Sequence, residues 1–208
     1  MRKILLTVVL LCIFCVGVVS AKTLMAEMPY IKYDGTKFSL YYSAKSPELG
    51  GYINEYYKKN EGYASWTELL AIHHYPKSFY PIEHAKEFKA YLDDSGIPSF
   101  TDVDDEANSA IMDFVIIDSN KLPIIMEFNV FKYVKSPVCG TIGLQYAKRY
   151  RIYNALEVEK IRKTFAKTRA KYVKRVNKIK IPELITQDVE NGQYVKKEEP
   201  KENSDTDK

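Results

Sequence analysis

Histidine side chains are the first candidates for chemistry in this chain, because all three of them, His73, His74 and His84, fall close together in the sequence. Histidine is the commonest metal ligand in proteins, and zinc requires three or four ligands in a tetrahedral array. A strand over 65–75 would, however, direct His73 and His74 to opposite faces, since neighbouring side chains of a strand alternate. No HExxH or cysteine-rich pattern accompanies them. The sequence therefore favours a histidine pair at a strand end, and it predicts no metal and no cofactor.

Trp66, the only tryptophan of the chain, is a candidate binding residue that the same alternation places on the same strand face as His74. Four tyrosines precede it within fourteen residues: Tyr52, Tyr56, Tyr57 and Tyr63. Tyrosine and tryptophan are enriched at binding surfaces and suit the recognition of sugars or peptides, although aromatic residues are also ordinary occupants of strands. We therefore predict that Trp66 and His74 contribute to a binding surface.

Polar residues interrupt two of the apolar runs that predict core strands. Glu127 and Asn129 lie in the first run, and Gln145 and Arg149 lie in the second. A buried carboxylate is costly unless it is paired and hydrogen-bonded, and the short connection over 135–140 brings Glu127 opposite Arg149, give or take one residue. The sequence thus predicts either a structural ion pair or a polar patch of these four residues that binds a ligand or a partner. No catalytic pair with a known spacing and no glycine-rich phosphate loop is present.

A long basic segment is the clearest feature of the charge distribution. Residues 148–180 hold thirteen Lys and Arg against two acids, whereas residues 183–208 hold four Lys and Arg against eight acids. Within the basic segment, residues 154–180 have an apolar stripe at helical spacing, which predicts an amphipathic helix. The sequence leaves three interpretations of the basic face of this helix: it is exposed to solvent, it is covered by the acidic tail, or it contacts an anionic membrane surface. Nucleic acid also binds basic faces, but such a partner does not fit an exported protein.

Export is predicted from the N-terminus, where a basic start precedes an apolar run from Ile4 to Val19 and then small residues, the pattern of a secretory signal peptide. The composition divides the chain into a signal peptide over 1–21, a single domain over 22–184 and a disordered charged tail over 185–208. Beyond the signal peptide one cysteine remains, Cys139, which excludes an internal disulfide. Export without a disulfide predicts a protein of the bacterial envelope, periplasmic or secreted.

The elements that must position these residues can be read from hydrophobic periodicity. We expect a hairpin over 30–44, two strands within 52–75, a helix over 81–92, strands over 109–117, 122–134 and 141–153, and a helix over 154–180. Residues 101–106 are predicted to be an acidic loop or a weak strand. The result is an α+β fold, with a twisted, mainly antiparallel sheet of five to seven strands, one mid-chain helix and one long C-terminal helix. We describe it as an α/β/α sandwich-like fold.

Three segments, "WTELLAIHHYP", "MDFVIIDSNKLPIIMEFNVFKY" and "GLQYAKRY", make the chain resemble small exported bacterial domains of uncharacterised function. The order of its elements over residues 28–180 is similar to that of the Mog1/PsbP-like sandwich. Because members of that fold mostly bind partners or assist assembly, the resemblance implies a protein without catalysis. It implies no functional residues.

The leading hypothesis is therefore an exported, non-enzymatic binding or assembly-accessory protein whose partner is an unknown protein or small ligand. Its candidate binding residues are Trp66, His74, Glu127, Asn129, Gln145 and Arg149. Two alternatives remain. The first is a metal-dependent envelope enzyme that uses His73, His74 or His84, and the second is a protein that attaches to the membrane surface through residues 154–180.

Overall fold

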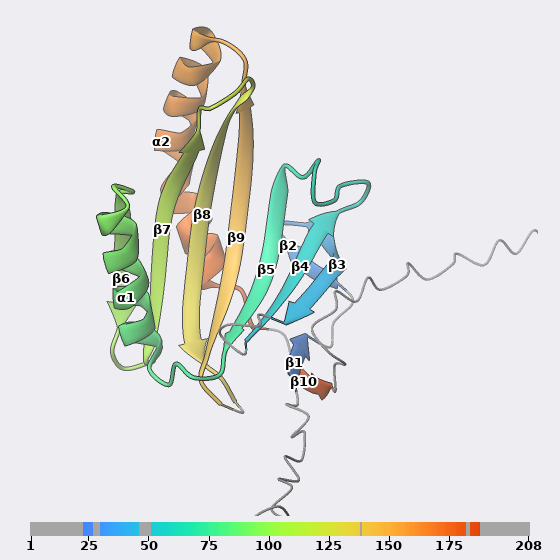
Figure 1. Cartoon of the computed structure of the whole chain (residues 1–208), viewed down its shortest axis with the longest axis vertical. Helices are drawn as coiled ribbons and strands as arrows, with labels where there is room; N and C mark the ends of the chain where they lie inside the picture. The colour runs from blue at the N-terminus through green and yellow to red at the C-terminus, as the bar shows by residue number, and fades with distance from the viewer. Residues whose placement is uncertain (1–22, 27–29, 46–50, 138, 182–183, 188–208) are drawn as a thin grey trace, which may run out of the picture.

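The computed structural model describes residues 23–26, 30–45, 51–137, 139–181 and 184–187. The predicted signal peptide and residues 188–208 of the predicted tail lie outside this part of the chain. Within it, the protein is α+β, as predicted, with one open eight-stranded sheet, one two-stranded sheet and two helices (Figure 1). The strands of the large sheet are β2 (Tyr30–Tyr33), β3 (Thr36–Lys45), β4 (Tyr52–Lys58), β5 (Glu68–Tyr75), β6 (Ser99–Asp104), β7 (Ser109–Asp118), β8 (Ile124–Lys135) and β9 (Thr141–Ile152).

The large sheet is built in two halves that meet at β5 and β9. Its strand order is β2-β3-β4-β5-β9-β8-β7-β6, and every neighbouring pair is antiparallel. The chain runs inward from β2 to β5, crosses to the far edge through helix α1 (Pro81–Asp94), and returns from β6 to β9. The predicted count of five to seven strands was too low. The reason lies at the edge, where β6 is largely exposed and lacks the apolar alternation that marks a strand in a sequence.

The two helices cover opposite faces of the large sheet. On β7, Met112 packs with Ala85 and Leu92 of α1, whereas the neighbouring residue Ile111 belongs to the cluster that contains Val176 of helix α2 (Ala155–Asn177). Since strand side chains alternate between faces, α1 and α2 lie on different sides, with α1 in front of the sheet and α2 behind it in Figure 1. We name these sides the α1 face and the α2 face.

Local sequence signals explain where the elements begin and turn. The β2–β3 hairpin turns at Asp34 and Gly35, both with positive φ, as expected for a two-residue turn of this sequence. Asn154 caps α2, because its side chain accepts a hydrogen bond from the Glu157 amide at 3.1 Å. The Glu157 carboxylate in turn accepts from the Tyr153 amide, one residue earlier than in the standard capping box.

The end of the ordered domain differs from the prediction. Residues 185–187 were assigned to the disordered tail, but Leu184–Gln187 forms strand β10, which pairs with β1 (Thr23–Ala26) in an antiparallel two-stranded sheet. Backbone pairing with a distant segment is not visible in the composition of so short a stretch. Within the described residues, no helix is both long enough and apolar enough to cross a lipid bilayer.

Candidate functional site

The ion pair expected between β8 and β9 lies on the α1 face. Glu127 and Arg149 are direct register partners, and the Arg149 guanidinium contacts the Glu127 carboxylate at 3.0 Å. The same guanidinium lies over the Trp66 ring, 3.6 Å from its centroid, in a cation–π contact. Three of the predicted binding residues are therefore neighbours.

A chain of hydrogen bonds extends from this pair along the sheet. Asn129, which is 1% exposed, donates to Glu127 at 3.2 Å and accepts from the Gln145 amide at 2.7 Å. The Gln145 carbonyl oxygen accepts from Nε2 of His73 at 2.8 Å. The structure thus brings together Trp66 and the four predicted polar residues, and it adds His73. We call these six residues the α1-face network.

His74 does not belong to this network, which corrects the prediction that it shares a face with Trp66. β5 begins at Glu68, so Trp66 lies before the strand and packs with Leu69 and Ala71 rather than following the alternation. His74 faces the α2 side, where its Nε2 donates to the carbonyl oxygen of residue 139 at 2.8 Å. The prediction that His73 and His74 lie on opposite faces is confirmed.

The histidines also fail to form the joint metal site of the alternative hypothesis. His84 lies on the side of His73, with its ring 4.2 Å from Tyr75 and 5.1 Å from Tyr133, so His74 is separated from both by the sheet. Burial lowers the pKa of His73 to about 4 and lowers the pKa of His74 and His84 as well. In the part of the chain that the structure describes, no three His, Cys, Asp or Glu residues converge in a way that could hold a metal ion.

Cys139 and His74 lie close together but do not form a nucleophile and base. The exposed Cys139 Sγ is 3.9 Å from His74 Nε2. The same nitrogen already donates its proton to the backbone carbonyl of Cys139. It therefore has no lone pair to accept the thiol proton, as a catalytic pair would require.

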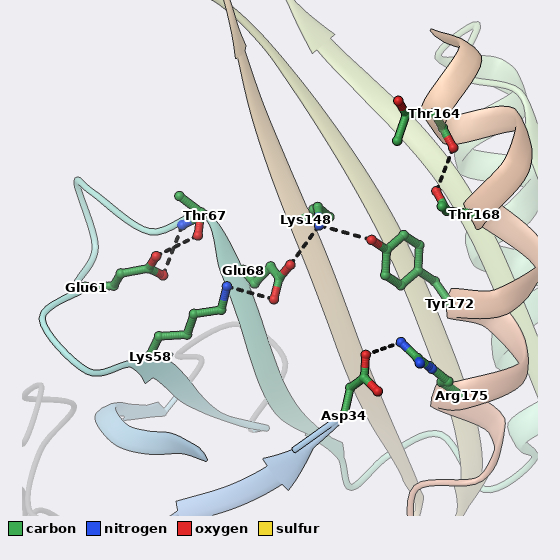
Figure 2. Close-up of polar contacts among 10 residues, drawn as sticks. All are labelled: Asp34, Lys58, Glu61, Thr67, Glu68, Lys148, Thr164, Thr168, Tyr172 and Arg175. Carbon is green, nitrogen blue, oxygen red and sulfur yellow. Dashed lines mark hydrogen bonds and ion pairs between the residues drawn. The ribbon is translucent and has the colours of Figure 1, made fainter. Parts of the chain in front are cut away.

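A second polar cluster lies on the α2 face, around a cavity of about 350 Å³ between α2 and the sheet. The side chains of its wall come from the β2–β3 hairpin, β4, β5, β9 and α2. Several of these side chains are drawn in Figure 2. We call this space the α2-face cavity. Sequence reasoning did not identify it.

Three charged side chains form an ion-pair triad in the cavity wall. The Glu68 carboxylate contacts the ammonium groups of Lys58 and Lys148, each at 2.8 Å, and Lys148 also donates to the Tyr172 hydroxyl at 3.0 Å (Figure 2). Burial disfavours the charge on Lys148, but the hydrogen bonds to Glu68 and Tyr172 outweigh it and raise the pKa of that ammonium. Burial likewise opposes the charge on Glu68, and the two lysines outweigh it and lower the pKa of that carboxyl. Glu68 and Lys148 are thus both held in their charged forms.

A second ion pair connects the hairpin turn with the helix at the cavity. Asp34 at the β2–β3 turn contacts the Arg175 guanidinium on α2. The positive φ of Asp34 belongs to the turn itself, so the hairpin geometry sets the position from which its carboxylate reaches the helix. The two carboxylates of the cavity wall, Asp34 and Glu68, are both engaged by cations.

Two buried tyrosine hydroxyls in the cavity wall have no such partners. Tyr33 is 5% exposed and Tyr146 is 0% exposed, and their ring centroids are 4.8 Å apart. Neither hydroxyl oxygen has a hydrogen-bond partner among the described protein groups. Burial raises the pKa of both tyrosines, so both keep their protons. Because an unsatisfied buried hydroxyl costs about 1–3 kcal/mol, a further hydrogen-bonding partner for these two groups would be favourable. Both oxygens are closed to solvent beside the cavity, so a ligand in the cavity reaches them when the neighbouring side chains move.

One signal in the sequence points to this cavity. Glu68 alternates with Leu70 and Ile72 in a predicted strand, and a carboxylate on an apolar face needs a partner. The pairing of β5 with β9, in which Glu68 lies opposite Lys148, supplies it. That pairing joins segments 80 residues apart, so neither hairpin nor helix periodicity reveals it.

Comparison with known proteins gives one positive result. A family model matches residues 26–181, a range that includes both helices, all eight strands of the large sheet and both polar clusters. No curated protein and no solved structure matches the chain.

Proposed function

We propose that this chain, which belongs to the uncharacterised family whose model matches residues 26–181, is an exported, non-enzymatic binding or assembly-accessory protein of the bacterial envelope. The α2-face cavity is its binding site. The observation that carries the proposal is the pair of buried, unpartnered hydroxyls of Tyr33 and Tyr146 in the cavity wall. The signal-like N-terminus supports the export.

The protonation states in the cavity favour binding over acid–base catalysis. A general acid or base works best when its pKa lies near the working pH. The pKa of Glu68 is lowered, whereas the pKa values of Lys148, Tyr33 and Tyr146 are raised. Each of these four groups therefore stays in one protonation state through neutral pH, which suits a fixed binding site.

The size of the cavity sets the size of the ligand. Pockets for small molecules span about 300–1,000 Å³, and a volume of about 350 Å³ is at the lower end of that range. The ligand is thus a small polar molecule, or one polar group of a larger partner. Helices on both faces of an antiparallel sheet also support the proposed similarity to the Mog1/PsbP-like sandwich, whose members mostly bind partners.

Filling the cavity tests the proposed site whatever the ligand is. Thr168 lines the cavity, and Thr164 lies one turn earlier on the exposed surface of α2. Each donates a 2.9 Å hydrogen bond to the carbonyl four residues earlier, which makes Thr164→Phe a matched control for Thr168→Phe (Figure 2). We expect native mass spectrometry of the exported protein to show a bound small molecule in the wild type and in Thr164→Phe, and loss of that molecule in Thr168→Phe.

Two results would contradict the proposal. The first is that the wild-type protein carries no bound molecule, either when it is purified from the envelope fraction or after it is incubated with an extract of that fraction. The other is equal retention of the molecule by Thr168→Phe and Thr164→Phe. Retention of the predicted signal sequence on the purified chain, measured by its intact mass, would contradict processing of the export signal.

A second candidate function, attachment to an anionic membrane surface, is favoured by exposed apolar residues at one end of α2. Leu156 is 85% exposed, and Leu122 in the β7–β8 connection is 70% exposed. The pairing of Ile124 with Ile152 brings the connection and the start of α2 to the same end of the sheet. If this surface inserts into a membrane, Leu122→Ser/Leu156→Ser abolishes flotation with phosphatidylglycerol vesicles, and unchanged flotation would exclude the insertion.

A further inference from the structure

The α2-face cavity has features that specify the chemical class of its ligand, and the inference rests on the proposed function of that cavity. Hydrogen-bond donors gather there from three elements. Tyr33 comes from β2, Tyr146 from β9 and Tyr172 from α2, with ring centroids 4.8 Å apart for the first two and 5.5 Å apart for the last two. The Tyr172 hydroxyl accepts its hydrogen bond from Lys148, which leaves its own proton available for a further acceptor.

Positive charge exceeds negative charge in the cavity wall. The cations are Lys58, Lys148, Lys171 and Arg175, and the carboxylates are Asp34 and Glu68, so four positive charges against two leave an excess of two. Lys171 forms no ion pair with a carboxylate in the described part of the chain. A partly enclosed site with this balance attracts an anion.

Other ligand classes fit the cavity less well. A cationic ligand needs a carboxylate, but Glu68 is shared by two lysines and Asp34 is engaged by Arg175. An apolar ligand would leave the hydroxyls of Tyr33 and Tyr146 without acceptors and would therefore keep their desolvation cost. A neutral polar ligand would satisfy the hydroxyls but would leave the excess positive charge uncompensated.

We propose that the α2-face cavity binds the carboxylate or phosphate group of a small anionic ligand, to which Tyr33 and Tyr146 donate hydrogen bonds. The excess positive charge of the wall, to which Lys171 contributes, attracts the group. The group belongs either to a free small molecule or to the head group of an anionic lipid, since both present the same oxygen acceptors.

Removal of the two hydroxyls is the direct test. Tyr33→Phe/Tyr146→Phe keeps both rings and deletes only groups that contact no described protein acceptor. Tyr133→Phe is the matched control, because the hydroxyl of Tyr133 is also buried and unpartnered, and the residue packs in the α1-face cluster. Calorimetric titrations in anion-poor buffer would use inorganic phosphate and acetate, with glycerol as the neutral probe. Flotation would use phosphatidylglycerol vesicles, with phosphatidylcholine vesicles for comparison.

We expect phosphate or acetate to bind wild type and Tyr133→Phe equally, and to bind Tyr33→Phe/Tyr146→Phe at least about tenfold more weakly. Lys171→Gln weakens binding by a smaller factor, and Lys174→Gln, an exposed cation of the same helix outside the cavity, leaves it unchanged. Binding to phosphatidylglycerol vesicles alone, with the same dependence on the two hydroxyls, assigns the anion to a lipid head group.

The experiments distinguish an incorrect ligand class from an incorrect binding site. Anion binding that is equal in wild type and Tyr33→Phe/Tyr146→Phe would overturn the inference. A cavity ligand that Thr168→Phe displaces and that proves to be neutral or cationic would overturn the inference while the proposed function stands. Absence of any bound molecule in every assay would overturn both.

Discussion

The α1-face network and the α2-face cavity are two polar clusters on opposite sides of the same sheet, and they differ in how completely their groups are satisfied. In the network, Glu127, Asn129, Gln145 and His73 are each hydrogen-bonded to a neighbour. In the cavity, both carboxylates are paired, but Lys171 has no carboxylate partner among the described residues, and the Tyr33 and Tyr146 hydroxyls have no hydrogen-bond partner among them. The comparison teaches that a polar patch inside a sheet is not in itself a binding site.

In this network every residue has at least one polar or cation–π partner, and of its buried side-chain nitrogen and oxygen atoms only Nε of Arg149 lacks a hydrogen bond within the described part of the chain. Such a network stabilises one arrangement of the sheet, because buried polar groups are favourable only when their partners are in place. An open cluster next to a cavity keeps a cost that a ligand can remove. The same substitution type should therefore have opposite consequences on the two faces. Removal of a network group should destabilise the free protein, whereas removal of a cavity hydroxyl should not.

The largest effect is expected for Asn129→Ala in the α1-face network. Asn129 links Glu127 to Gln145 and is 1% exposed. Its loss removes the partner of one Glu127 carboxylate oxygen and of the Gln145 amide nitrogen, and it leaves a small void, although Glu127 keeps Arg149 and Gln145 keeps His73. We expect the free energy of unfolding to fall by about 2–4 kcal/mol, as measured by urea denaturation. Ligand binding in the cavity should be unaffected. A loss below about 0.5 kcal/mol would show that the network contributes little to stability.

A somewhat smaller effect is expected from protonation of His73. Its pKa is about 4 in the folded protein, below the ordinary value of 6.5, because burial disfavours the imidazolium. Between these two pH values the unfolded chain binds more protons than the folded one, so stability falls as the pH falls from about 6.5 to 4. The contribution that is present above pH 6.5 and is mostly lost by pH 4 is about 3 kcal/mol.

Thermal unfolding at several pH values measures this dependence. Carboxylates titrate in the same range, and the comparison must therefore be made with His73→Gln, which cannot gain a proton and can still donate to Gln145. We expect the variant to lose stability less steeply between pH 6.5 and 4 than the wild type. Equal slopes for the two proteins would show that His73 is protonated as readily in the folded as in the unfolded state.

The smallest effect is expected for Tyr33→Phe/Tyr146→Phe without ligand. The hydroxyls have no partner among the described protein groups, so their removal eliminates a desolvation cost and loses no protein contact. We expect the free energy of unfolding to stay unchanged or to rise by up to about 1 kcal/mol. A decrease of more than about 1 kcal/mol would show that the hydroxyls are satisfied within the free protein, by protein groups or by tightly held water.

The sequence predicted the α1-face network well and the α2-face cavity not at all, for a physical reason. Glu127 and Arg149 lie on strands joined by a short connection, so the connection length sets their register. The prediction named His74 as the histidine on the face of Trp66, whereas the structure has His73 there. The reason is that Trp66 precedes β5, where strand alternation no longer applies. The cavity depends on the pairing of β5 with β9 and on the position of α2, and neither is encoded in local periodicity.

A crystal structure of the protein purified from its own envelope fraction, with no anion added, tests the central claim most directly. The account predicts density for a small molecule in the α2-face cavity, with acceptor atoms within hydrogen-bonding distance of the Tyr33 and Tyr146 hydroxyls. The account would be contradicted if ordered water were the sole partner of both hydroxyls, both in the purified protein and in protein incubated with an extract of that fraction. Side chains of α2 packed into the space would also contradict it, because either result would make the cavity a structural feature like the network on the opposite face.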